Sequence, residues 1–187
     1  MKLKILAVAV AVLSLASWSM AADVKSGLKV GEEVGAFDVT KLAGAESDGV
    51  KIGQQLCYRC KNSARPQVMI FTRSSDEKVI AFVKKLDAEL TKNSDKQLRA
   101  FVNYLGENKD AAADAAKKLA TTTKATNVPF VVPNEFENGP EDYGLNAKAE
   151  VTVLVAKDGK VTANHAFAKA KDLDVDSILK DVEKTVN

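Results

Sequence analysis

The chain has 187 residues, of which 27 are Lys or Arg, 25 are Asp or Glu and 46% are hydrophobic. This length suits one domain with a hydrophobic core of its own. The near balance of charges, with no stripe of Lys and Arg interleaved with aromatic residues, excludes the sequence signature of a nucleic-acid-binding protein.

The first residues have the composition of a secretory signal peptide. Two lysines within the first four residues precede an apolar stretch at residues 5–16, which is too short to cross a membrane core that needs about 20 apolar residues. Residues 19–21, Ser-Met-Ala, supply the small side chains that a signal peptidase requires. We therefore predict a cleaved signal peptide at residues 1–21 and a mature domain at residues 22–187, periplasmic or secreted and without a membrane anchor.

Apolar patterning predicts strands that alternate with helices over most of the mature chain. The continuous apolar run Val68–Phe71 is typical of a strand buried on both faces, whereas apolar residues three and four positions apart indicate a helix at residues 75–90. Ser74 and Glu77 are spaced as a capping box for that helix. In chain order we expect a strand around residues 37–39, a polar loop at 54–65, a strand at 68–71, a helix at 75–90, a strand at 98–105, a helix at 110–120, strands at 128–132, 151–156 and 161–167, and a terminal helix at 175–186.

The connections between these elements indicate the fold class. Asp158-Gly159 lies between two apolar runs and can accept the positive φ angles of a tight turn, which predicts a β-hairpin. Pro129 lacks an N–H group and should hold its strand at a sheet edge or place itself at a strand start. Strands separated by helices pair in parallel through right-handed crossovers. We therefore predict an α/β fold with a mixed sheet covered by helices on both faces.

Several short sequence segments resemble the corresponding segments of one known group of proteins. Arg65–Phe71 looks like the first core strand of that group, and Val131–Asn134, Tyr143–Leu145 and residues 151–161 look like its later elements. Over roughly residues 28–186 the chain resembles the peroxiredoxin and redoxin branch of the thioredoxin-like superfamily. The resemblance implies a thioredoxin-like fold with a β-α-β-α-β-β-α core and an additional strand at the N-terminus.

The chain lacks a cysteine where this family performs its chemistry. Thioredoxins place their cysteine pair, and peroxiredoxins their peroxide-attacking cysteine, at the start of the helix after the first core strand, where the helix N-terminus stabilises a thiolate. The corresponding residues 72–76 are Thr-Arg-Ser-Ser-Asp. The cis-proline that these folds usually set before the hairpin is also missing, since residues 149–151 are Ala-Glu-Val. We therefore do not expect a peroxidase.

The two cysteines of the chain, Cys57 and Cys60, form a CxxC pair in the polar loop before the first core strand. Arg59, Lys61 and Arg65 surround them, and nearby cations favour the reactive thiolate. A close cysteine pair in an exported protein is oxidised by default, and it can exchange between dithiol and disulfide with a partner. The loop is expected to provide no helix that would activate the pair. A loop that folded over the end of the sheet would still bring the thiols to the usual site of the family.

Two functions fit this pair. In the first, the protein is an exported thiol–disulfide oxidoreductase in which Cys57 attacks a protein or small-molecule thiol or disulfide partner and Cys60 resolves the mixed disulfide. In the second, the Cys57–Cys60 disulfide is structural and the domain is a non-catalytic binding or scaffold protein. A zinc site is less favoured because two thiolates are half of a tetrahedral set, and a c-type haem because Lys61 follows the pair where its attachment motif has His. We expect no cofactor and no metal.

His165 is the single histidine of the chain. It alternates with Val161, Ala163 and Phe167 in the second hairpin strand, so we expect a structural residue on the core-facing side, with no identifiable partner for proton transfer. Four acidic residues between positions 135 and 142 match no known calcium loop and are expected to be a solvated loop.

Overall fold

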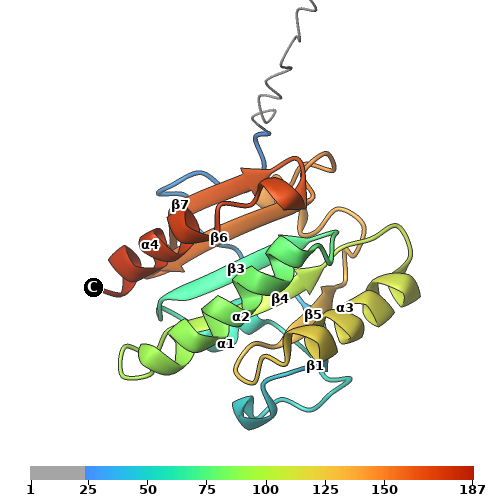
Figure 1. Ribbon diagram of the computed structural model, residues 1–187, viewed down its shortest axis with the longest axis horizontal. Coiled ribbons are helices and arrows are strands. Elements are labelled where there is room, and N and C mark those ends of the chain that lie inside the picture. Colours follow the sequence, from blue (N-terminus) through green and yellow to red (C-terminus); the bar gives the residue numbers. More distant parts are fainter. Residues whose placement is uncertain (1–23) are drawn as a thin grey trace, which may run out of the picture.

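Seven strands and four α-helices follow one another within residues 24–187, the part of the chain that the computed structural model describes (Figure 1). The predicted signal peptide at residues 1–21 lies outside this part. The strands are β1 (Val39–Ala43), β2 (Gln55–Leu56), β3 (Gln67–Thr72), β4 (Arg99–Tyr104), β5 (Phe130–Pro133), β6 (Val151–Lys157) and β7 (Lys160–Phe167). The helices are α1 (Tyr58–Asn62), α2 (Glu77–Lys92), α3 (Lys109–Thr123) and α4 (Val175–Val186), with single 3-10 turns at η1 (Glu46–Asp48), η2 (Glu141–Tyr143) and η3 (Ala170–Asp172).

The strands form one mixed sheet in the order β2-β1-β5-β4-β3-β6-β7. β3 pairs in parallel with β4, and β4 pairs in parallel with β5, through the crossover helices α2 and α3. β6 is antiparallel to both β3 and β7, while β1 is antiparallel to both β5 and β2. The predicted mixed sheet is confirmed.

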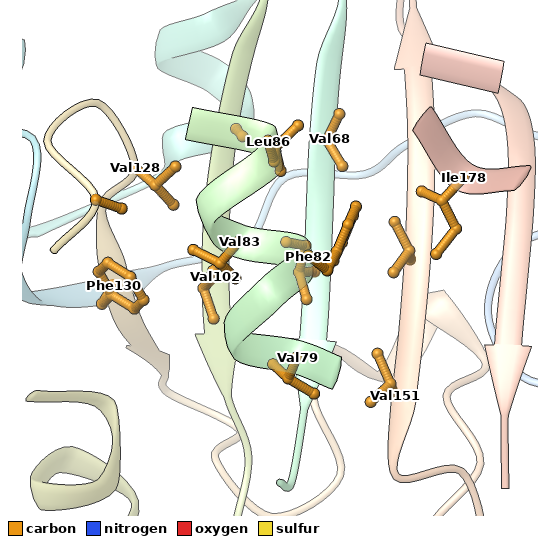
Figure 2. Packing of buried hydrophobic residues seen from close by; sticks show 14 of the residues in the cluster. Val68, Val79, Phe82, Val83, Leu86, Val102, Val128, Phe130, Val151 and Ile178 are labelled. Carbon is orange, nitrogen blue, oxygen red and sulfur yellow. The ribbon is translucent and has the colours of Figure 1, made fainter. Parts of the chain in front are cut away.

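Helices α2, α3 and α4 cover one face of the sheet, in front of the strands in Figure 1. Phe82 and Leu86 of α2 are fully buried against alternate residues of the central strands, such as Val68 (Figure 2). Ile178 of α4 joins the same cluster. Burying one such side chain contributes about 1.5–3 kcal/mol, so this layer supplies much of the stability of the fold. Within residues 24–187, none of the helices combines the length and the hydropathy that a membrane span needs.

The opposite face is covered by extended segments and the short helix α1. Phe71 and Phe101 point to this face, and the ring of Phe37 lies 5.9 Å and 6.0 Å from theirs. Tyr143, from the segment between β5 and β6, meets Phe37 edge-on at 5.0 Å. Tyr58 brings α1 onto the same aromatic cluster. Helices therefore lie on both faces, as predicted, but the long ones are all on one face.

The β6–β7 hairpin confirms the predicted turn. Asp158 has φ 54° and Gly159 has φ 76°, and the two residues join strands that pair from Val151–Phe167 to Lys157–Lys160. Pro129 immediately precedes β5, an inner strand, so its missing N–H removes no ladder hydrogen bond. The prediction of a strand start is therefore confirmed for Pro129.

Helix α2 begins later than its predicted capping box requires. Asp76 is the N-cap residue, and its carboxylate accepts the N–H of Lys78 at 2.9 Å. Ser74 Oγ instead accepts the N–H of Asp76 at 3.2 Å, and Glu77 is the first helical residue. The predicted Ser74–Glu77 box is wrong because the Asp76 carboxylate caps the helix two residues further on, where negative charge complements the helix dipole.

The segment at residues 54–65, predicted to be a loop, contains β2 and α1. This prediction is wrong because a helix of five residues offers no hydrophobic period that a sequence pattern could reveal. Tertiary contacts of Tyr58 fix the helix instead.

Gly44 follows β1 at a point where no side chain fits. Its φ is 73°, and a Cβ atom at this position would lie 2.2 Å from the carbonyl oxygen of Val128. We expect Gly44→Ala to lower the free energy of unfolding by about 3 kcal/mol, because a left-handed backbone and a backbone clash both oppose it. Gly53→Ala is the matched control, with φ 83° and nothing within 4 Å, and should cost about 1 kcal/mol. Urea denaturation measures both variants, and equal losses would contradict the clash.

Candidate functional site

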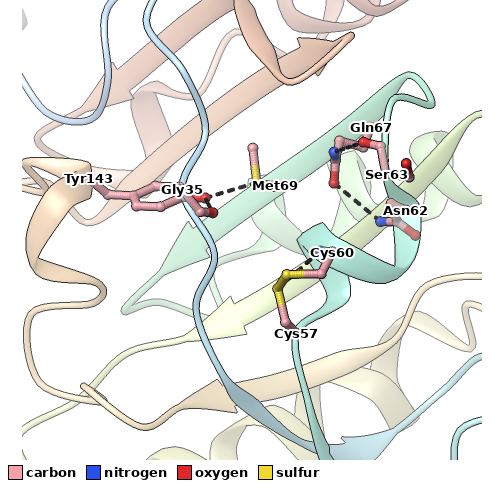
Figure 3. The surroundings of a disulfide bond; sticks show 8 residues. All are labelled: Gly35, Cys57, Cys60, Asn62, Ser63, Gln67, Met69 and Tyr143. Atoms are coloured by element: carbon pink, nitrogen blue, oxygen red, sulfur yellow. Dashed lines mark hydrogen bonds between the residues drawn. A yellow bond between two sulfur atoms is a disulfide. The ribbon is translucent and has the colours of Figure 1, made fainter.

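Cys57 and Cys60 are joined by a disulfide at the start of helix α1 (Figure 3). Cys57 is the N-cap residue of the helix, with extended backbone angles, and Cys60 lies within its first turn. Cys57 is half-buried and Cys60 is exposed. The disulfide predicted from the sequence is therefore present, and it lies at the surface, within reach of a partner thiol.

A backbone N–H donates a hydrogen bond to the sulfur of Cys57 in the disulfide form. Its Sγ accepts the backbone N–H of Cys60 at 3.0 Å. If this contact is kept on reduction, the Cys60 N–H donates to the free sulfur of Cys57, and a hydrogen bond to the charged form favours the thiolate. The expectation that the pair has no helix is thus wrong, although a helix of five residues contributes mainly through this one N–H group.

Tyr58 anchors helix α1 to the body of the protein. Its ring stacks on Phe101 with centroids 5.5 Å apart, and its hydroxyl donates to Asp48 Oδ2 at 2.5 Å. Burial, reinforced by the hydrogen bond to the Asp48 carboxylate, raises the pKa of the Tyr58 hydroxyl above its ordinary value. Tyr58 therefore remains a neutral donor that ties the cysteine-bearing helix to the loop after β1.

Asp48 is itself held by a buried lysine, Lys41 of β1, whose side chain is 1% exposed. The Lys41 Nζ donates to Asp48 Oδ1 at 2.8 Å and to the carbonyl oxygens of Ala45 and Val50 at 2.8 and 2.9 Å. All three donors of the ammonium group are satisfied, as burial of a charge requires. The chain of contacts from Lys41 through Asp48 to Tyr58 fixes α1 relative to the sheet. Sequence reasoning missed Lys41, because a lone lysine in a strand carries no pattern.

The three predicted cations lie on α1 and in the turn that follows it. Lys61 and Arg65 are exposed, while Arg59 is half-buried. Arg59 points to the turn of the β6–β7 hairpin. A Cβ atom added to Gly159 in that turn would lie 3.1 Å from Nη2 of the Arg59 guanidinium. Its Nε is buried and has no hydrogen-bond partner among residues 24–187. The charge of Arg59 also opposes, without overcoming, the effect of burial that raises the pKa of Tyr143.

The disulfide does not lie at the helix N-terminus where the redoxins that the sequence resembles place their reactive cysteine. Helix α1 packs on the aromatic face through Tyr58, whereas α2 packs on the other face. Helix α1 leads into the N-terminal end of β3, near the hairpin turn, where the N–H of Asp158 donates to the Ala64 carbonyl. Helix α2 starts beyond the C-terminal end of β3, at the opposite end of that strand from the point where α1 joins it. The hypothesis that the loop brings both thiols to the usual site is therefore wrong.

The position that corresponds to the reactive cysteine of redoxins holds hydroxyl groups in this protein. Thr72 Oγ1 accepts the N–H of Ser74 at 3.1 Å, and Ser75 Oγ lies 3.3 Å from the Tyr104 hydroxyl. Arg73 is half-buried, and burial lowers the pKa of its guanidinium. A hydroxyl here cannot replace the ionised sulfur of a peroxidase, so the expectation of no peroxide turnover stays a prediction with this structural reason.

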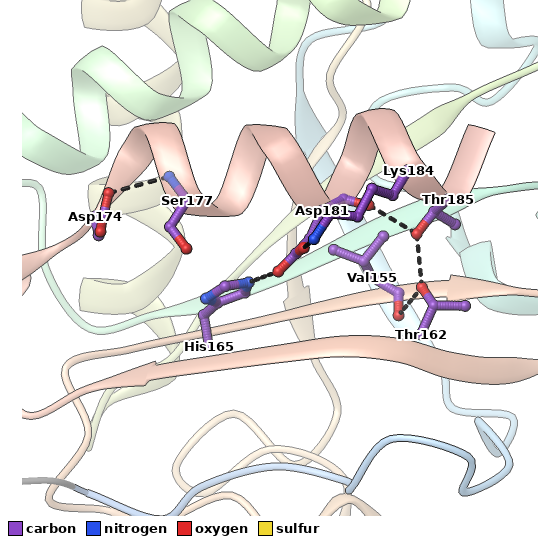
Figure 4. A network of polar contacts seen from close by, with 8 residues as sticks. All are labelled: Val155, Thr162, His165, Asp174, Ser177, Asp181, Lys184 and Thr185. Carbon is purple, nitrogen blue, oxygen red and sulfur yellow. Dashed lines mark hydrogen bonds and ion pairs between the residues drawn. The ribbon is translucent and has the colours of Figure 1, made fainter. Parts of the chain in front are cut away.

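His165 has a partner that sequence reasoning did not find. Its Nε2 lies 3.1 Å from Asp181 Oδ2 on α4, and Lys184 pairs with the same carboxylate at 2.6 Å (Figure 4). The Lys184 hydrogen bond, more than the charge of His165, lowers the pKa of the Asp181 carboxyl. A bulge in β7 turns Val161 to the opposite face from Ala163, so the simple alternation predicted for this strand is wrong. His165 ties β7 to α4, which is a structural role.

The acidic residues between positions 135 and 142 are exposed, as expected of a solvated loop. Among residues 24–187, no three His, Cys, Asp or Glu side chains lie close enough together to hold a metal ion.

Comparison with known proteins gives a match in structure only. No protein-family model matches the chain, and no curated protein sequence does. The AhpC structure from Mycobacterium tuberculosis matches with a TM-score of 0.61 at 16% identity, covering 86% of this chain and 99% of that chain. A protein of Chlorobium tepidum assigned as thiol:disulfide interchange protein DsbE matches with 0.60 at 13% identity, covering 86% and 99%. The thiol peroxidase from Chromobacterium violaceum matches with 0.56 at 12% identity, covering 90% and 93%.

These structural matches show that the fold is shared. At such low sequence identities they do not assign a chemistry, which depends on the residues of the site in this chain. The resemblance to redoxins that the short sequence segments indicated is confirmed at the level of the fold. The chain therefore has the thioredoxin-like fold of these redoxin structures, with its cysteine pair on the helix before the first parallel strand instead of the helix after it.

Proposed function

We propose that the protein is an exported thiol–disulfide oxidoreductase in which Cys57 and Cys60 are the redox pair. One observation carries this proposal: the surface disulfide begins a helix, and the Sγ of Cys57 accepts the Cys60 N–H at 3.0 Å. That arrangement stabilises a thiolate at Cys57 and leaves Cys60 next to it as the resolving thiol. Arg59 and Lys61 lie on the same helix, and cations near a thiol favour the same ionised state.

The exchange balances without a cofactor. The Cys57 thiolate attacks one sulfur of a partner disulfide, forms a mixed disulfide and releases the other partner sulfur as a thiolate. Cys60 loses its proton and attacks the Cys57 sulfur, which closes the Cys57–Cys60 bond and releases the second partner thiolate. Two electrons pass from the protein to the partner, and the reverse sequence oxidises a partner dithiol.

A second candidate function is favoured by the position of the pair. The disulfide lies across the sheet from the N-terminus of α2, where related folds hold their reactive cysteine, and it closes a loop too small to stabilise the whole fold. In that case the bridge is static, and the domain is a non-catalytic binding or scaffold protein.

Reduction of insulin by dithiothreitol separates the two candidates. We expect the protein to accelerate the reaction, Cys57→Ser to abolish the acceleration, and Cys60→Ser to accumulate a mixed disulfide through Cys57. Ser75→Ala, at the usual site of the family, is the matched control and should retain full activity. If the unmodified protein does not accelerate insulin reduction, the oxidoreductase proposal fails and the scaffold remains.

Export is supported by the signal-like pattern at residues 1–21 and by the presence of a disulfide, which persists in oxidising compartments. Cells that express the full chain should yield, in the extracytoplasmic fraction, a protein whose N-terminal residue is Ala22. Full-length protein confined to the cytoplasm would contradict export.

A further inference from the structure

A cavity of about 450 Å³ lies beside helix α1, at the end of the sheet where β3 and β4 begin. Tyr58 and Lys61 of α1 form one wall, Arg65 and Arg99 lie near the strand starts, and Leu90 comes from the C-terminal part of α2. Small-molecule sites in proteins have volumes of about 300–1,000 Å³, so this cavity is large enough for a small organic ligand.

The cavity carries positive charge that residues 24–187 do not neutralise. Lys61, Arg65 and Arg99 line it, and none of them forms an ion pair in this part of the chain. Arg65 and Arg99 donate only to neutral acceptors. Asp48, the lone carboxylate of the lining, is already paired with the buried Lys41. A ligand that complements this cavity is therefore an anion.

The uncharged lining is of two kinds. Ser47, Ser94 and Asn127 provide hydroxyl and amide groups, whereas Leu90 and Leu98 provide apolar surface. Polar groups orient a ligand and apolar surface supplies burial, so the lining suits a molecule with an anionic head and a compact apolar body.

We propose that this cavity binds a small organic anion, a carboxylate or a phosphate monoester attached to a compact apolar group. Guanidinium and ammonium groups form charge-assisted hydrogen bonds with both head groups. The proposal goes beyond the thiol chemistry and does not depend on it, because neither Cys57 nor Cys60 lines the cavity.

Titrations of the oxidised protein, followed by nuclear magnetic resonance, test the proposal with three probes of similar size: benzoate, phenyl phosphate and the neutral benzyl alcohol. We expect at least one anion to bind and to shift the amide signals of cavity residues, with benzyl alcohol weaker by about tenfold. Tighter binding of phenyl phosphate would identify the head group as a phosphate, and tighter binding of benzoate would identify a carboxylate. Binding of neither anion, or benzyl alcohol binding as tightly as the anions, would overturn the proposal.

Charge-removing variants locate the site. The triple variant Lys61→Gln, Arg65→Gln and Arg99→Gln should raise the dissociation constant of the anion by about tenfold or more. A double Cys57→Ser and Cys60→Ser variant should bind as the unmodified protein does, whether or not the oxidoreductase proposal holds.

The matched control removes the same charge from exposed lysines outside the cavity, through Lys118→Gln, Lys148→Gln and Lys180→Gln. This control should keep the original affinity. Equal weakening in both triple variants would show a general effect of net charge and would overturn the proposed site. Denaturation midpoints of both triple variants verify that they are folded.

Discussion

Replacing Lys41 by Met should lower the free energy of unfolding by about 3 kcal/mol, because removal of one partner of a buried ion pair leaves the other uncompensated. Lys41 is 1% exposed and satisfies the Asp48 carboxylate together with two carbonyl oxygens. Without the ammonium group, the Asp48 carboxylate loses its ion-pair partner in a site that is only 17% exposed, and the contact that positions Tyr58 is weakened. Urea denaturation at neutral pH measures the loss.

Two further variants serve as controls for the Lys41→Met measurement. Lys51→Met changes an exposed lysine near the same loop and should stay within about 0.5 kcal/mol of the unmodified protein. The double variant Lys41→Met with Asp48→Asn should lose less than the sum of the two single changes, because no unpaired charge remains. A Lys41→Met loss no larger than that of Lys51→Met would contradict the role of the buried pair.

The two cysteines should differ in ionisation once the disulfide is reduced. At neutral pH we expect the thiolate fraction of Cys57 in the Cys60→Ser variant to exceed that of Cys60 in the Cys57→Ser variant by about tenfold, because Cys57 Sγ accepts a backbone N–H at the start of α1. Ultraviolet absorbance of the thiolate, recorded as a function of pH, measures both fractions.

The control for this experiment is Arg59→Gln in the Cys60→Ser background. It removes a cation from α1 but keeps the backbone hydrogen bond, so the thiolate fraction of Cys57 should fall only in part. Equal ionisation of the two cysteines would contradict the assignment of Cys57 as the attacking thiol.

The layered architecture could be predicted from the sequence because it depends on repeated patterns. The continuous apolar run at Val68–Phe71 indicates a buried strand, and the helical spacing of Val79, Val83 and Leu86 indicates a helix. Packing in the buried core favours the same secondary structures. The Asp158-Gly159 turn was predictable for the same reason, since few other residue pairs accept its backbone angles.

The candidate site was harder to predict because single tertiary contacts determine it. Tyr58 is the buried aromatic residue that anchors helix α1. Its position depends on contacts with Phe101 and with the Lys41–Asp48 pair, and no spacing pattern in the sequence links these residues to the cysteines. The capping of α2 by Asp76 depended on competition between neighbouring polar residues that spacing alone does not resolve. The sequence therefore predicted the Cys57–Cys60 disulfide but not the face of the sheet on which it lies.

The reduction potential of the Cys57–Cys60 couple tests most directly whether this disulfide is a working redox pair. It is obtained by equilibrating the protein in thiol–disulfide buffers, alkylating the free thiols and quantifying the reduced and oxidised forms by mass spectrometry. We predict a value between about −270 and −120 mV, the range spanned by known thiol–disulfide oxidoreductases. A value below about −300 mV, as found for inert structural disulfides, would contradict the proposed function.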